Sequence, residues 1–298
     1  MYNPNMLKWM ARLAAMSVFL AATLTGAAPD LASRITELTR ATEWTRRDAI
    51  PIRFRTHHPQ GLVKIGDRLF LSSVEVVDRD AGKGVGHLFQ FDLSGTLIGA
   101  TKLGEGAIYH PGGLDYDGRH IWVAVAEYRP NSQSIVYRID PQAMAASEVF
   151  RFADHLGALV HDTETHALHG VSWGSRVFYR WPLSGDGRVA NAAQPERVAN
   201  PSHYIDYQDC KFAGQRRMAC TGVTEFRVTP GSEPFRLGGI DLVSLRDHRP
   251  IHQVPLLLWT RGLDLAHNPV WLEATTSGLR GYFVPEDDDS TLYVYETR

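Results

Sequence analysis

Two segments of the chain are near-copies of each other, and this repetition constrains the fold more than any other feature. His58 opens the sequence HPQGL, and His110 opens the sequence HPGGL. Each histidine is followed seventeen residues later by a glutamate, Glu75 and Glu127. Between them lie an apolar run, a tight Gly/Asp turn and a second run of β-forming residues, a pattern typical of a β-hairpin. We therefore expect each repeat to bring an imidazole and a carboxylate to the same end of its hairpin.

The repeat continues more weakly along the chain, with a histidine near the start of each expected first strand. These histidines are His58, His110, His155, His203 and His267. Their spacings of 52, 45, 48 and 64 residues lie at or above the roughly 40 to 50 residues of a four-stranded propeller blade. The apolar spacing of two favours strands over helices. We predict an all-β, five-bladed propeller with four antiparallel strands in each blade.

The fifth unit has three strands before the sequence reaches Arg298. The segment 45–54 precedes the first hairpin and has no other partner, so we expect it to pair with 291–295 and supply the missing strand. Such a closure removes the exposed sheet edges of a linear array. The predicted organisation is a signal peptide at 1–27, a lead-in at 28–44 and a single propeller domain at 45–298.

The N-terminal segment has the features of a targeting signal. Lys8 and Arg12 precede an apolar run at 13–24, and small residues follow at 25–27. About a dozen apolar residues are too few to span a bilayer, so we expect cleavage and a secreted or periplasmic protein without a transmembrane span, the alternative being an uncleaved anchor. Cleavage would change the net charge from −2 to −4. This charge excludes the strongly basic surface of a nucleic-acid-binding protein. We expect a monomer that binds a small molecule or sugar.

The two cysteines of the chain flank the turn of the expected fourth hairpin. Cys210 and Cys220 would face each other across two antiparallel strands, at a separation that suits a disulfide. An exported protein would fold in an oxidising compartment, which favours the bridge. The alternative is a pair of buried free thiols.

The expected functional face is the one where first strands begin and second strands end, because these points surround the mouth of the central channel. We predict that a divalent metal is held by His58, His110, His155 and His267. Imidazole and carboxylate ligands suit Zn, Mn or Fe, whereas oxygen ligands alone would suit Ca. Glu75 or Glu127 would act as the base, and further ligand contacts are expected from Trp173, Glu225 and Glu286. A metal-free acid–base site and simple blade capping by the histidines are the alternatives.

The second repeat also carries a family resemblance. The sequence HPGGLDYDGRHIWVA at 110–124 resembles the blade motif of gluconolactonase-like, strictosidine-synthase-like and NHL-type propellers. Those families mostly have six blades, and the lactonase-like enzymes hold a divalent metal through Glu, Asn and Asp at the channel mouth. The resemblance implies a propeller with its site at that mouth, although this chain carries His in place of those ligands and five expected blades.

Two classes of function fit these features. One is a metal-assisted hydrolase of a small lactone, ester or glycoside, with the metal polarising a carbonyl or activating water. The other is a non-catalytic module that binds a small molecule, sugar or peptide through Trp173 and the His and Glu side chains at the channel mouth. A propeller fold alone implies no activity. The number of His and Glu side chains that meet in one site therefore separates the hydrolase from the binding module.

Overall fold

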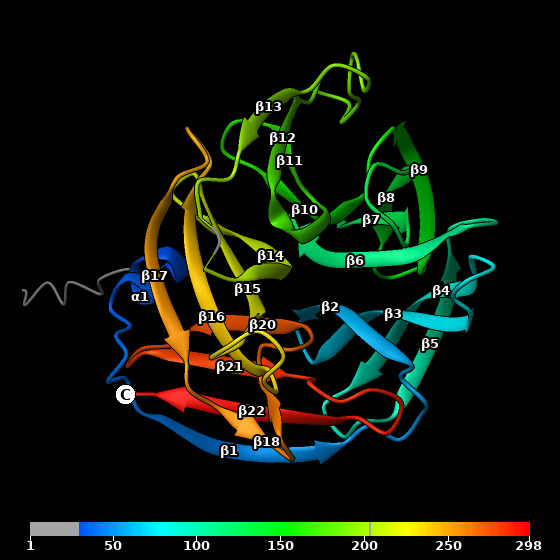
Figure 1. Cartoon of the computed structure of the whole chain (residues 1–298). Helices are drawn as coiled ribbons and strands as arrows, with labels where there is room; N and C mark the ends of the chain where they lie inside the picture. Colours follow the sequence, from blue (N-terminus) through cyan, green and yellow to red (C-terminus); the bar gives the residue numbers. More distant parts are fainter. Residues whose placement is uncertain (1–29, 203) are drawn as a thin grey trace, which may run out of the picture.

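The computed structural model describes residues 30–202 and 204–298. Five four-stranded antiparallel sheets surround a common axis, as Figure 1 shows in the view along it. We number these blades 1 to 5 in chain order. The sequence prediction of a five-bladed propeller is confirmed. The predicted signal peptide at 1–27 lies outside the described residues.

Each of the first four blades takes four consecutive strands, the first of which lies nearest the axis. Blade 1 contains β2 (His58–Ile65), β3 (Arg68–Asp78), β4 (Lys83–Asp92) and β5 (Leu97–Leu103). Blade 2 contains β6 (Ile108–Tyr116), β7 (Ile121–Glu127), β8 (Ser134–Asp140) and β9 (Ala145–Phe152). Blade 3 contains β10 (Leu156–Asp162), β11 (Ala167–Ser172), β12 (Val177–Pro182) and β13 (Glu196–Ala199). Blade 4 contains β14 (Asp206–Gly214), β15 (Arg217–Phe226), β16 (Phe235–Ser244) and β17 (Pro250–Leu256).

Blade 5 closes the propeller with strands from both ends of the chain. Its strands are β20 (Val270–Ala274), β21 (Leu279–Phe283), β22 (Thr291–Thr297) and β1 (Trp44–Pro51). The antiparallel pairing of β1 with β22 confirms the predicted closure. A two-stranded hairpin, β18 (Trp259–Thr260) with β19 (Leu263–Asp264), lies between blades 4 and 5, and sequence reasoning missed it. The lead-in forms a short helix, α1 (Leu31–Thr36), whose N-terminus is capped by the Asp30 side chain.

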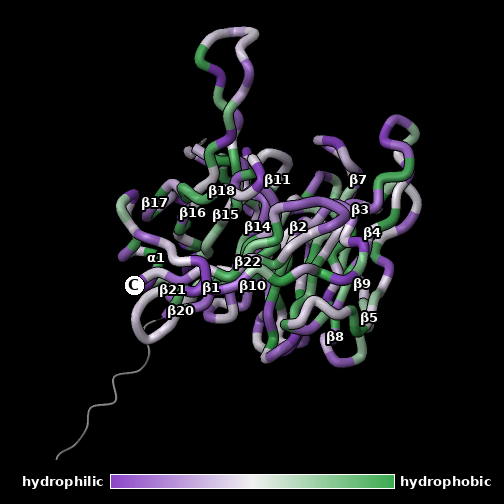
Figure 2. The backbone as a smooth tube through the Cα atoms, turned by 90° about the horizontal axis from the view of Figure 1, so that it is seen from below, coloured by the Kyte–Doolittle hydropathy of each residue, from purple (hydrophilic) through white to green (hydrophobic). Residues whose placement is uncertain are grey.

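Apolar side chains pack between neighbouring blades. Apolar segments run through the body of the propeller in Figure 2, where hydropathy colours the backbone. Leu62 and Leu71 of blade 1 pack with Leu292 and Val294 of blade 5, so the closure is also a hydrophobic interface. Burial of this kind is the main favourable contribution to folding. The blades therefore form one continuous packed ring.

A buried carboxylate ties the innermost strands together at the axis. Asp209 on β14 accepts the backbone N–H of Leu62 on β2 at 3.0 Å and that of Leu114 on β6 at 3.1 Å. It also pairs with Lys211, and both side chains are almost fully buried. Gly113 permits this approach, because a Cβ there would lie 2.5 Å from the Asp209 carboxylate. One side chain thus joins blades 1, 2 and 4.

The predicted disulfide is confirmed. Cys210 and Cys220 stand opposite each other on β14 and β15 and are joined. Such bonds are typical of proteins from oxidising compartments. Within residues 30–202 and 204–298, no helix is long and apolar enough to cross a membrane.

The Asp209 tie predicts a large loss of stability on truncation. Asp209→Ala leaves the Lys211 charge and two N–H groups buried without a partner, and breaking a buried pair in this way costs about 3 to 5 kcal/mol. Urea unfolding of wild type and variant measures the loss. Asp206→Ala is the matched control, because Asp206 lies on the same strand but pairs with Arg176 at the surface, where ion pairs contribute about 0 to 1 kcal/mol. Equal losses in both variants would contradict this account of the axis.

Candidate functional site

A cavity of about 660 Å³ lies at the mouth of the propeller, on the face where the inner strands begin. We call it the mouth cavity. Its lining includes six of the residues predicted from sequence: His58, His110, His155, Trp173, Glu225 and His267. The blade repeat places the histidines there, because each one lies within three residues of the start of an inner strand. His203, which the repeat also suggests, lies outside the described residues.

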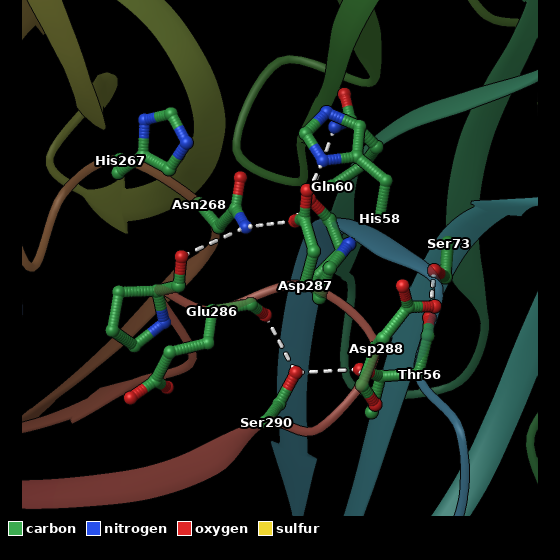
Figure 3. A network of polar contacts seen from close by, with 12 residues as sticks. Thr56, His58, Gln60, Ser73, His267, Asn268, Glu286, Asp287, Asp288 and Ser290 are labelled. Atoms are coloured by element: carbon green, nitrogen blue, oxygen red, sulfur yellow. Dashed lines mark hydrogen bonds and ion pairs between the residues drawn. The ribbon is translucent and has the colours of Figure 1, made fainter. Parts of the chain in front are cut away.

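His58 is held by a carboxylate that comes from blade 5. Its Nδ1 lies 2.8 Å from Oδ1 of Asp287, and the Asn268 amide donates to the same oxygen at 3.0 Å (Figure 3). Burial raises the pKa of Asp287, but the hydrogen bond and charge of His58 outweigh this and hold the pKa below its usual value. Because an ionised carboxylate only accepts hydrogen bonds, Nδ1 of His58 carries a proton. In this tautomer the second ring nitrogen, Nε2, is the one that can accept a proton.

His155 is oriented in a similar way by backbone. Its Nδ1 lies 2.8 Å from the carbonyl oxygen of Glu127, so Nδ1 donates and Nε2 keeps its lone pair. Burial lowers the pKa of His155. The ring meets Trp173 edge to face at 4.7 Å between centroids. Trp173 begins the short 3-10 helix η1 (Trp173–Ser175), which follows β11 at the mouth.

His110 is, like His155, one of the two most buried histidines at the mouth cavity. It is 6% exposed, its ring stacks on Tyr128 at 4.7 Å, and His155 lies 6.0 Å away between centroids. Burial, followed by the neighbouring His155 and His58, lowers its pKa well below the usual value. Among the described residues, its Nδ1 has no hydrogen-bond partner. A buried polar atom without a partner is costly, so this nitrogen is an unsatisfied group beneath the surface of the cavity wall.

The fourth histidine stands beside an ion pair. His267 Nδ1 lies 3.4 Å from the guanidinium of Arg236, which in turn pairs with Glu225 at 3.0 Å. Burial and the charge of Arg236 lower the pKa of His267. Because guanidinium only donates, Nδ1 of His267 is the acceptor. Glu225 is thus at the cavity as predicted, but its carboxylate is neutralised by Arg236.

The two glutamates predicted as bases face elsewhere, and a register shift is the reason. If the pairing of Leu62 with Leu71 continued without interruption, Glu75 would stand opposite His58. A β-bulge between Pro59 and Gly61 shifts the pairing, so that His58 instead faces Val74. Bulges in β6 act likewise, and His110 faces Ala126. A slip of one residue turns a side chain to the other face of its sheet.

Both glutamates therefore take other partners. Glu75 approaches His87 at 3.2 Å and His57 at 4.0 Å, in a depression next to the mouth cavity. The Glu127 carboxylate pairs with Arg129, and only its backbone carbonyl serves the site. Neither side chain lines the mouth cavity.

His57, Glu75 and His87 could hold a metal ion. Their candidate ligand atoms lie within 4.8 Å of one another, and in the part of the chain that the structure describes they are the one group that meets this criterion. The four predicted histidines surround the mouth cavity but do not form such a group. His57 has a left-handed backbone, with φ of 57°, stabilised by a hydrogen bond from the Asp288 N–H to its carbonyl. This conformation is uncommon outside glycine and often marks functional sites.

The expectation that Glu286 contacts a ligand is not supported by its position. Glu286 is 7% exposed, and its carboxylate accepts hydrogen bonds from the Tyr293 hydroxyl at 2.6 Å and the Thr291 N–H at 3.2 Å. Its carbonyl accepts from Ser290 (Figure 3). Glu286 thus organises the loop that presents Asp287. The acidic run 286–289 signalled this loop in the sequence, but not which carboxylate meets His58.

Comparison with known proteins places the chain in a family. The model of the "Family of unknown function (DUF6454)" matches residues 17–298. The chain belongs to this family. No curated protein matches the sequence.

Solved structures support the fold of this DUF6454 chain. A mannose phosphorylase from Leishmania mexicana, in complex with phosphate, has a TM-score of 0.53 at 9% identity and covers 85% of this chain and 88% of its own. A glucose dehydrogenase scores 0.51 at 11% identity, with 84% and 98% covered. A hypothetical protein from Leishmania major scores 0.50 at 11% identity, with 85% and 90% covered. At these identities the likeness establishes a shared fold alone, as the sequence resemblance to propellers implied.

The environment of His110 and His155 predicts that both take up a proton at lower pH than an exposed histidine. An unperturbed histidine has a pKa of about 6.5, whereas burial lowers both pKa values here. Nitrogen-detected NMR at pH 5.5 should show both rings less protonated than an exposed histidine, with the proton of neutral His155 on Nδ1. Fully charged rings at that pH would contradict the buried, backbone-held arrangement.

Proposed function

We propose that this protein is an exported hydrolase of small esters or lactones, with the mouth cavity as the substrate site and His58 as the general base. The observation that carries this proposal is the contact between His58 and Asp287 at the edge of a cavity large enough for a small substrate. A histidine whose Nδ1–H is held by a carboxylate is fixed in the tautomer that accepts a proton at Nε2. Such a base would take a proton from water as the water attacks a carbonyl carbon.

The charges of the cavity favour ester or lactone hydrolysis over glycoside hydrolysis. A glycosidase needs one carboxylic acid that stays protonated and a second carboxylate near it. The two carboxylates that line the mouth cavity, Glu225 and Asp206, are each engaged in an ion pair with an arginine. The imidazoles are therefore the better candidates for proton transfer.

The alternative is a non-catalytic binding module for a small molecule or sugar. It rests on the aromatic wall of the cavity, where Tyr128 and Trp173 meet at 5.1 Å between centroids. Aromatic faces of this kind suit stacking on a ligand. Binding without turnover in the experiment below would favour it.

Loss of His58 should remove hydrolysis and leave the fold intact. His58→Ala and Asp287→Asn should lower kcat on 4-nitrophenyl esters and simple lactones by about 10² or more, because general-base catalysis contributes about 10² to 10⁴. Colorimetric and pH-stat assays of the purified chain provide the measurement. His120→Ala is the control, since His120 lies in the turn between β6 and β7, away from the mouth cavity. Full activity of His58→Ala would refute His58 as the base.

A divalent metal would assist this reaction from the neighbouring depression. His57, Glu75 and His87 offer two imidazoles and one carboxylate, a donor set that suits Zn, Mn or Fe better than Ca. The ring planes of His57 and His87 lie within 8° of parallel, so one ring would have to turn to direct both lone pairs at one ion. His58 and Arg79 line both the depression and the mouth cavity. A metal there would supply polarisation of a carbonyl or activation of water.

Metal content separates this ligand set from the four histidines inferred from sequence. After dialysis against Zn²⁺, elemental analysis should find about one ion per chain, lost in His87→Ala and retained in His110→Ala and His120→Ala. Uptake should weaken below about pH 6, because the imidazoles must be deprotonated to bind. Loss of metal in His110→Ala with retention in His87→Ala would favour the sequence-derived set instead.

A further inference from the structure

We propose that the mouth cavity selects substrates that carry an oxyanionic group, a carboxylate or a phosphate, and that Arg79 binds this group. The inference rests on the proposed function, because it names the chemical class that the same site would take. Arg79 follows the end of β3, in the link to β4, and lines both the mouth cavity and the neighbouring depression. Sequence reasoning did not single it out.

The charged groups that line the mouth cavity are not all paired with one another. Two guanidinium groups line the cavity, those of Arg79 and Arg236. Arg236 is neutralised by Glu225 at 3.0 Å. Within the described ranges, Arg79 has no ion pair, and the carboxylate before it in the chain, Asp78, accepts the N–H of Ala81. Among the described residues, Arg79 is therefore the guanidinium of the mouth cavity that no ion pair neutralises.

Arg79 is also held in place without using its hydrogen-bond donors. Its guanidinium carbon lies 4.3 Å from the centroid of the Tyr128 ring, a cation–π contact. Tyr128 in turn stacks on His110 at 4.7 Å. The three side chains form a column from the rim to the buried wall of the cavity. The guanidinium is thus positioned beforehand, while its five N–H donors remain free for a planar oxyanion.

The buried histidine at the other end of this column adds a second argument. His110 is 6% exposed and, among the described residues, its Nδ1 lacks a partner. A ligand anchored at Arg79 would lie against the wall that His110 forms and bring its polar atoms toward Nε2 of His155, because Nδ1 of His155 is held by the Glu127 carbonyl. An ester whose acid or alcohol part bears a carboxylate fits this arrangement, because one end meets the cation and the reacting carbonyl lies between the imidazoles.

Binding tests this inference independently of catalysis. Isothermal titration of the full chain with succinate and with inorganic phosphate should show binding that weakens as salt is added, whereas the neutral succinamide should not bind. Arg79→Met should weaken anion binding at least tenfold. Arg79→Lys should lose less affinity than Arg79→Met because lysine keeps the charge, but it should bind more weakly than wild type because lysine lacks the planar guanidinium. Arg129→Met is the matched control: it removes one charge from the same face at a residue that pairs with Glu127 and does not line the cavity. Succinate and phosphate are compared to learn which oxyanion the site prefers.

Turnover provides the second readout. The mono-4-nitrophenyl ester of succinic acid should be hydrolysed with a higher kcat/KM than 4-nitrophenyl acetate, and Arg79→Met should abolish this preference by raising KM. Equal binding of succinamide and succinate, or unchanged anion affinity in Arg79→Met, would overturn the inference. Anion binding that depends on Arg79 without any hydrolysis would support the inference and refute the proposed hydrolase.

Discussion

The Asp209 carboxylate at the axis is the interaction on which the rest of this propeller depends. Five inner strands converge on a narrow space, where backbone groups at the blade tips meet neither solvent nor a regular partner strand. Asp209 accepts two of these N–H groups from different blades, and Lys211 balances its charge. Asp115 does the same for the N–H groups of His161 and Phe212. Buried polar groups are tolerated only when they are satisfied in this way.

This central tie makes the mouth of the propeller a rigid platform. The histidines of the mouth cavity lie close to the starts of the inner strands, so the spacing between them follows from how closely the strands approach. The approach is close because glycines occupy the contacts: a Cβ on Gly61 would lie 2.4 Å from the Leu114 nitrogen. Sites built on such elements hold their geometry better than sites on loops. The loop residues Arg79 and Asp287 then add charge to a fixed arrangement of imidazoles.

The five repeats are structurally alike but chemically different at the mouth. Each equivalent histidine has a different partner: a carboxylate for His58, a backbone carbonyl for His155, a guanidinium for His267 and an aromatic face for His110. A residue needed only to cap a blade would be expected to repeat its contact along with its position. The divergence of the partners favours a binding role for the histidines over a purely structural one.

The sequence by itself determined the repeat, the number of blades, the closing strand and the pairing of Cys210 with Cys220. These follow from periodicity and from strand neighbours, which are local properties of the chain. It also directed attention to the face that carries the mouth cavity. Tertiary structure alone decided which groups meet there. One-residue bulges moved Glu75 and Glu127 off the cavity, a left-handed backbone turned His57 toward His87, and closure of the ring brought Asp287 to His58 across more than two hundred residues. The spacing of residues along the chain does not predict these three features, because a bulge or a closure contact depends on strands that are distant in sequence.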